Sequence, residues 1–62
     1  MITVRFKFMH ETKGALRYIE INDQDEGIEL KESVIGTIYL RKSALDGAHP
    51  QHIQVSVMME EA

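Results

Sequence analysis

The chain opens with a strict alternation of apolar and polar residues. Within residues 2–8 the two classes occupy opposite parities: Ile2, Val4, Phe6 and Phe8 are apolar, and Thr3, Arg5 and Lys7 are polar. Successive side chains of a strand point to opposite faces, whereas a helical period would scatter these apolar residues around the cylinder. β-branched and aromatic residues are also typical of strands. The pattern therefore predicts a strand over residues 2–8.

A second alternating run follows a polar turn. Residues 10–14 are polar and end in Gly14, which tolerates the positive φ that hairpin turns require, so the chain is expected to reverse there. Residues 15–21 then alternate, with Ile19 and Ile21 in phase. This run predicts a second strand whose inner face carries the two isoleucines.

The register of this hairpin follows from matching the faces of its strands, because a slip of one residue moves every side chain to the other face. The matched arrangement pairs Phe6 with Ile19 and Val4 with Ile21. A four-residue turn gives this register. A two-residue turn at 13–14 gives a neighbouring register with the same faces, and both alternatives stay open.

The middle of the chain predicts an acidic loop followed by a third strand. Residues 22–33 are rich in acids and turn formers and read as an exposed loop, with at most one short helical turn near 29–33. Ile28 and Leu30 are expected to tuck against the edge of the sheet. The third strand is predicted over residues 35–41.

The last third of the chain predicts a loop, a fourth strand and a tail. Residues 42–50 form the loop, in which Leu45 is an apolar plug and Asp46-Gly47 a turn. Residues 52–59 alternate again and give the fourth strand. Residues 60–62 are expected to fray.

These runs predict an all-β fold, one domain over residues 1–62 with a four-stranded antiparallel sheet made of two hairpins. Its inner face, the predicted core and dimer face, collects apolar side chains from all four strands: Ile2, Val4, Phe6, Phe8, Ile19, Ile21, Ile38, Leu40, Ile53, Val55 and Val57. Leaving such a face in water would cost on the order of 10 kcal/mol, comparable to the stability of a small domain. We therefore expect a homodimer or higher oligomer, face to face or strand-exchanged, with edge-to-edge pairing as a variant. The alternative is a small barrel closed on itself.

Composition strengthens the expectation of self-association. With 62 residues the chain lies where an unaided core leaves little net stability, and the absence of cysteine removes disulfides as a remedy. Apolar runs are too short for a membrane-spanning helix, and Arg5 and Lys7 interrupt the apolar opening as no signal-peptide core would. The chain is expected to be soluble, unprocessed and cytoplasmic.

The outward face gathers the candidate ligand-binding residues. Cations and tyrosines are predicted there: Arg5, Lys7, Arg17, Tyr18, Tyr39 and Arg41. Single-strand nucleic-acid binders use such faces, with cations along the phosphates and rings stacked on bases. The alternative is an ordinary solvated face in which Arg5 pairs with Glu20 across the strands. The net charge of −3 favours that alternative.

Other chemistry finds little support in the sequence. His49 and His52, with His10 as a third candidate, have a spacing that is weak evidence for a metal site without cysteine, so no metal is predicted. No serine lies in a nucleophile elbow, and the four glycines are scattered singly, so neither an enzyme nor a cofactor is predicted. The expected function is a non-enzymatic homodimeric β-sheet interaction module; the alternative is weak single-stranded nucleic-acid binding.

Three stretches carry a resemblance. They are ETKGALRY at 11–18, IGTIYLRKSAL at 35–45 and HIQVSV at 52–57. Together they resemble a pattern in short bacterial proteins of uncharacterised function and cover most of the chain. The resemblance implies a small protein that stands alone, and it implies no activity, cofactor or site.

Overall fold

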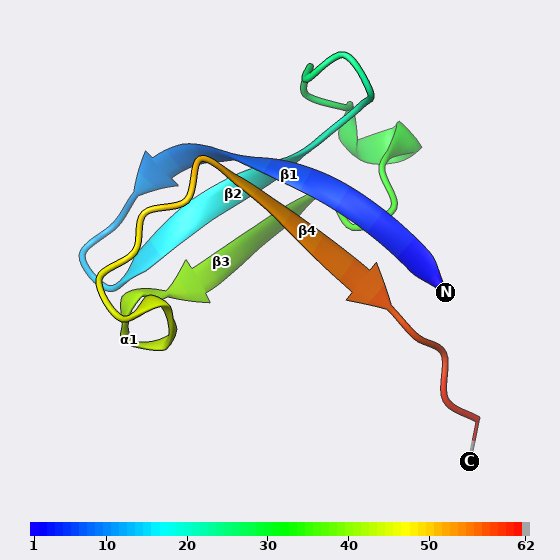
Figure 1. Cartoon of the computed structure of the whole chain (residues 1–62). Coiled ribbons are helices and arrows are strands. Elements are labelled where there is room, and N and C mark those ends of the chain that lie inside the picture. The colour runs from blue at the N-terminus through cyan, green and yellow to red at the C-terminus, as the bar shows by residue number, and fades with distance from the viewer. Residues whose placement is uncertain (62) are drawn as a thin grey trace.

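Four antiparallel strands form one curled sheet in the computed structural model, which describes residues 1–61 (Figure 1). The strands are β1 (Ile2–Glu11), β2 (Ala15–Ile21), β3 (Thr37–Arg41) and β4 (His52–Val57). Their order in the sheet is β3-β2-β1-β4. The prediction of a four-stranded antiparallel β fold is confirmed.

The prediction of two hairpins is wrong for the second pair. β4 does not pair with β3 but crosses to the far side of β1, which gives a Greek-key order. The connection of residues 42–51 contains a short helix, α1 (Lys42–Leu45), where a plain loop was predicted. Leu45 packs on the core as the predicted plug, and Asp46 and Gly47 turn the chain at φ 50° and 88°.

The segment before β3 contains the predicted short helical turn, as a 3-10 helix η1 (Leu30–Glu32). Leu30 is 76% exposed, so the expectation that it tucks against the sheet is wrong. β3 starts two residues later than predicted because Gly36 adopts φ 97°, outside strand geometry. β4 ends at Val57 rather than at residue 59; of the tail 60–62, residue 62 lies outside the described residues.

A β-bulge in β1 overturns the predicted register of the first hairpin. The turn itself is the two-residue alternative, closed by the amide of Thr12 on the carbonyl oxygen of Ala15 at 2.8 Å. His10 pairs with Arg17, but Phe8 pairs with Tyr18, so Met9 is an extra residue on β1. The register beyond the bulge is shifted by one residue, and the face that β2 presents is reversed.

This reversal exchanges the residues of β2 between the two faces. Phe6 lies opposite Glu20 rather than Ile19, so the inner face of β2 carries Leu16, Tyr18 and Glu20. Ile19 and Ile21 were predicted for the inner face and instead lie outward, beside Lys7 and Arg5, the residues that they pair with. Ile21 is nevertheless buried, because the acidic loop folds back over it and forms a bridge from Gly27.

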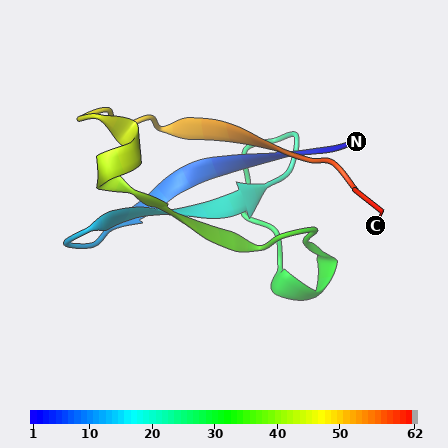
Figure 2. The ribbon, with the colours of Figure 1, turned by 90° about the horizontal axis from the view of Figure 1, so that it is seen from below.

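The curl of the sheet buries the centre of the inner face within one chain (Figure 2). Phe6, Leu16 and Tyr18 are fully buried, and Val4 is 6% exposed. Partly buried residues surround this core: Phe8, Ile35, Ile38, Leu40, Leu45, Ile53 and Val55. A second copy is therefore not needed to cover the centre of this face, so its burial does not require a face-to-face dimer.

Tyr18 links the core to the connection that precedes β4. Its hydroxyl donates a hydrogen bond of 2.7 Å to the carbonyl oxygen of Pro50, in the connection that leads to β4. Its ring meets Phe8 edge to face, with ring centroids 6.0 Å apart. Burial raises the pKa of the Tyr18 hydroxyl. Tyr18 was a predicted outward binding residue, and its burial removes it from that set.

Candidate functional surfaces

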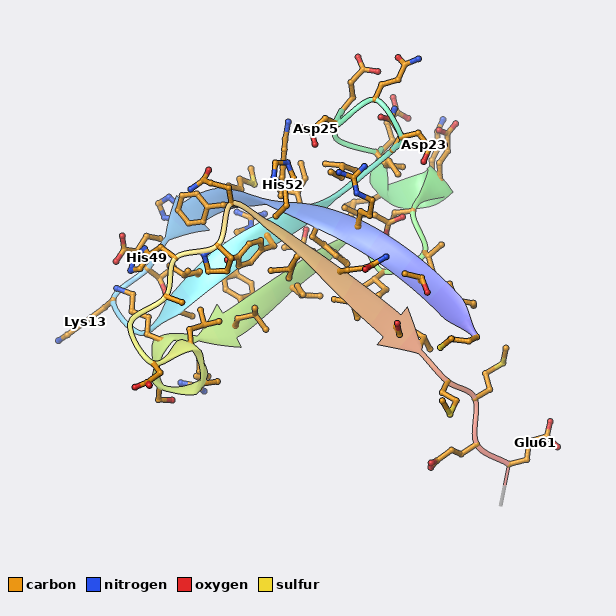
Figure 3. All side chains as sticks on the ribbon, viewed as in Figure 1. Lys13, Asp23, Asp25, His49, His52 and Glu61 are labelled. Atoms are coloured by element: carbon orange, nitrogen blue, oxygen red, sulfur yellow. The ribbon has the colours of Figure 1, made fainter. Side chains whose placement is uncertain are left out.

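The acidic loop reaches over the outward face at Arg5, Lys7 and His52. Asp25 receives a hydrogen bond of 2.9 Å from Nζ of Lys7 on its backbone oxygen. Its carboxylate Oδ1 lies 2.8 Å from Nε2 of His52 and 3.8 Å from a guanidinium nitrogen of Arg5. Figure 3 shows Asp25 above the strands close to His52, with Asp23 turned away. Two of the predicted binding cations, Arg5 and Lys7, are thus engaged by an acid of the same chain.

The sequence of the loop explains why it folds back in this way. The side-chain oxygen of Asn22 accepts hydrogen bonds from the amides of Gln24 and Glu26, at 2.8 and 3.0 Å, which closes a tight turn. Asp25 adopts φ 66° at its tip. Gly27 then packs against Ile19, where a Cβ would lie 2.8 Å from the isoleucine Cδ1, so a larger residue would require the Ile19 side chain to shift.

The outward face is exposed around Tyr39 and Arg41. The guanidinium of Arg17 lies 5.9 Å from the centre of the Tyr39 ring, and Tyr39 is 58% exposed. Arg41 is exposed on the same face of β3, and His10 faces Arg17 across the strands. Nε of Arg17 is buried and has no hydrogen-bond partner among the described residues. This open cluster is smaller than the predicted surface.

Glu20 is the residue that sequence reasoning missed. It is 3% exposed on the inner face, and its carboxylate accepts hydrogen bonds from the amides of Val34, Ile35 and Gly36 at 2.8–3.0 Å. Burial by itself raises the pKa of the Glu20 carboxyl. The hydrogen bonds from the three amides together lower this pKa by more than burial raises it, so the pKa lies below its ordinary value. Glu20 therefore fastens the chain that leads into β3 to the end of β2.

A hollow of about 380 Å³ lies beside Glu20 and Arg5, where β2 has ended. Strand residues, the loop and the segment before β3 line it: Thr3, Val4, Arg5, Glu20, Ile21, Asp23, Val34 and Gln54. Glu20 is fully engaged by backbone amides. Arg5 and Asp23 are the other charged groups at this hollow.

The histidines do not converge. His52 contacts Asp25, whereas His10 and His49 lie near Glu11, where β1 ends. The hydrogen bond from Lys42 lowers the pKa of Glu11, with smaller contributions from the charges of these two histidines. Within residues 1–61 no three His, Cys, Asp or Glu side chains are grouped as a metal site would require.

Within residues 1–61 no strand pairs with the outer edge of β4, and the register of β4 on β1 fixes which of its backbone groups point outward. The amide of Phe8 donates to the carbonyl oxygen of Gln51 at 2.8 Å, which makes Phe8 and Gln51 a hydrogen-bonded pair. Such pairs recur at every second residue of an antiparallel ladder, so the pairs of Phe6 with Ile53 and of Val4 with Val55 are also hydrogen-bonded. Ile53 and Val55 consequently direct their backbone groups to β1. The backbone groups of the alternate residues His52, Gln54 and Ser56 point away from the sheet.

The edge of β4 carries no charged residue apart from His52, if that side chain is protonated. Met58 and Met59 follow it and are 71% and 75% exposed. Natural edge strands are usually protected by lysine, proline or a bulge, and β4 has none of these between His52 and Val57. Sequence alternation revealed the strand but not that this edge is free, which depends on the strand order.

None of the helices within residues 1–61 has the length and apolar character needed to cross a bilayer. No family model, no curated protein and no solved structure matches this chain.

Proposed function

We propose that the protein is a small non-catalytic interaction module that forms a homodimer by pairing β4 with β4 of a second copy. The observation that carries this proposal is the β4 edge, which has no Lys, Arg, Asp or Glu and directs the backbone groups of three successive alternate residues outward. β3, at the opposite edge, is shorter and ends in the charged Arg41. β4 is the edge better suited to accept a strand.

The register of such a dimer is restricted by parity. Only residues with outward backbone groups can form hydrogen-bonded pairs, so in an antiparallel pairing Gln54 must lie opposite His52, Gln54 or Ser56 of the second copy. These arrangements keep the inward side chains on a common face. They bring together the half-buried Ile53 and Val55 of the two copies and extend one sheet across both chains. A register shifted by one residue would leave the outward backbone groups without hydrogen-bond partners and would place the apolar side chains of the two copies on opposite faces.

A single strand pair buries little area, so the dimer is expected to be weak, with a dissociation constant on the order of micromolar. The exposed Met58 and Met59 adjoin the edge and supply adaptable apolar contact. The dimer would present two copies of the outward face on one continuous surface, which suits a module that binds a repeated partner.

Gln54→Pro is expected to abolish the dimer while the monomer stays folded. The amide of Gln54 points away from β1, so proline removes only a hydrogen bond that the second copy would accept. Gln54→Ala keeps that amide and is the matched control. Light scattering over a concentration series, with circular dichroism to verify folding, is the measurement. Equal association of the two variants contradicts the proposal. Wild-type protein that stays monomeric at every concentration up to about millimolar contradicts it as well.

Weak single-stranded nucleic-acid binding is the second candidate function. It is supported by the open cluster of Arg17, Tyr39 and Arg41, in which an arginine covers an exposed ring. The test is fluorescence anisotropy with a labelled oligothymidylate at low salt. Tyr39→Ala should weaken binding, since it removes the stacking platform, and binding that is unchanged by both Tyr39→Ala and Arg41→Ala contradicts this candidate.

A further inference from the structure

Three donors on the outward face converge on one loop residue. Arg5 and Lys7 come from β1 and His52 from β4, and all three contact Asp25. An ionised carboxylate only accepts hydrogen bonds, so Nε2 of His52 must carry the hydrogen in this contact. The sheet thus aims a guanidinium, an ammonium and an imidazole N–H at one position.

Asp25 uses only part of this donor capacity. A single oxygen, Oδ1, serves His52 at 2.8 Å and Arg5 at 3.8 Å, so the guanidinium is within ion-pair range but beyond hydrogen-bond distance. Lys7 contacts the backbone oxygen rather than the carboxylate. An anion with more oxygens than a carboxylate would satisfy these donors better, and a guanidinium is suited to bidentate contact with phosphate.

The site is reachable and has room beside it. The side chains of Arg5, His52 and Asp25 are about half exposed, at 46%, 49% and 51%. Arg5 also lines the hollow of about 380 Å³, whose lining includes the neutral Thr3 and Gln54 and the acidic Glu20 and Asp23. Water and small solutes can therefore reach the guanidinium without unfolding of the sheet.

We propose that Arg5, Lys7 and His52 form a binding site for a phosphate group, and that the carboxylate of Asp25 occupies this site as an internal competitor. The phosphate group is either free phosphate or the phosphodiester of a single strand that continues to the open cluster of Arg17, Tyr39 and Arg41. In the resting chain the acidic loop weakens this binding. This site does not depend on dimerisation. The three side chains project from the outward face of the sheet, whereas the dimer would use backbone groups at the edge of β4.

Removal of the Asp25 carboxylate should expose the site without releasing the loop. The hydrogen bonds of Asn22 and the bridge between Ile21 and Gly27 hold the loop independently of that carboxylate. Asp25→Gly suits the φ of 66° and leaves the backbone oxygen for Lys7. Asp23→Gly is the matched control, because it removes the same charge from the same loop, and Asp23, although it lines the hollow beside Arg5, makes no hydrogen bond or ion pair with the three donors.

Two probes are titrated at low salt: inorganic phosphate, followed by NMR shifts of Arg5 and His52, and labelled oligothymidylate, followed by anisotropy. Asp25→Gly should bind at least one probe about 10-fold more tightly than wild type, the gain expected for charge-assisted contacts, and Asp23→Gly less than about 3-fold. A gain for phosphate alone identifies a free anion as the ligand, and a gain for the oligonucleotide alone identifies a strand. Adding Arg5→Ala should remove the gain.

Equal gains for Asp25→Gly and Asp23→Gly would reduce the effect to net charge and overturn the proposal, as would no gain for either probe. If Asp25→Gly does not fold, Asp25→Asn replaces it, since asparagine also tolerates positive φ. Asp25→Asn must then bind more tightly than Asp23→Asn, and equal affinities of these two variants overturn the proposal in the same way.

Discussion

Glu20→Ala is expected to lower the free energy of unfolding by about 3 kcal/mol or more, because it leaves three amides without their acceptor. Val34, Ile35 and Gly36 all donate to this one carboxylate. A chain of 62 residues has a stability of roughly 3–9 kcal/mol, so this loss removes at least about a third of the free energy of unfolding. Urea denaturation at fixed protein concentration measures the effect. Hydrogen exchange of these three amides provides a second readout. If they exchange no faster in Glu20→Ala than in wild type, the role assigned to Glu20 is contradicted.

The pH dependence of stability provides an independent test of Glu20. Because the folded state lowers the pKa of the Glu20 carboxyl, its contribution is complete above the ordinary pKa of about 4.5 and is lost as pH falls through the folded-state pKa. Glu20→Gln keeps the shape and one acceptor oxygen but does not titrate. Its urea midpoint should therefore fall less between pH 6 and pH 3 than that of wild type. Parallel curves for the two proteins contradict the role assigned to Glu20.

Phe6→Ala is expected to cost about 3–5 kcal/mol, the range for removal of a fully buried phenylalanine. Phe6 is 0% exposed at the centre of the inner face, between β2 and β4. Phe8→Ala is the matched control, because Phe8 lies on the same strand and face but is only partly buried. Denaturation midpoints of both variants, taken at one concentration, should place Phe6→Ala well below Phe8→Ala. The reverse order contradicts the core described here.

The first strand could be predicted from sequence, and the face of the second could not. β1 has one apolar parity, whereas β2 offers two, with Leu16 and Tyr18 on one side and Ile19 and Ile21 on the other. Periodicity favoured the isoleucines because the competing parity includes Glu20. The choice is made by the bulge at Met9 and by the amides that neutralise the cost of burying that carboxylate.

The candidate surface was partly predictable for a related reason. Alternation correctly assigned Arg5, Lys7, Tyr39 and Arg41 to the outward face. It does not encode where a loop folds, and the return of Asp25 over Arg5 depends on the turn closed by Asn22 and on Gly27. The position of β4 beside β1 was likewise hidden, because apolar patterning fixes faces and not neighbours.

The most direct test of the proposed β4 dimer is the concentration dependence of amide hydrogen exchange along β4. The amides of Ile53 and Val55 face β1 and should be protected at every concentration. Those of Gln54 and Ser56 face outward, so they should exchange freely in dilute samples and become protected as the protein is concentrated. Gln54 and Ser56 amides that stay unprotected at the highest concentration, while Ile53 and Val55 remain protected, would contradict the proposed dimer.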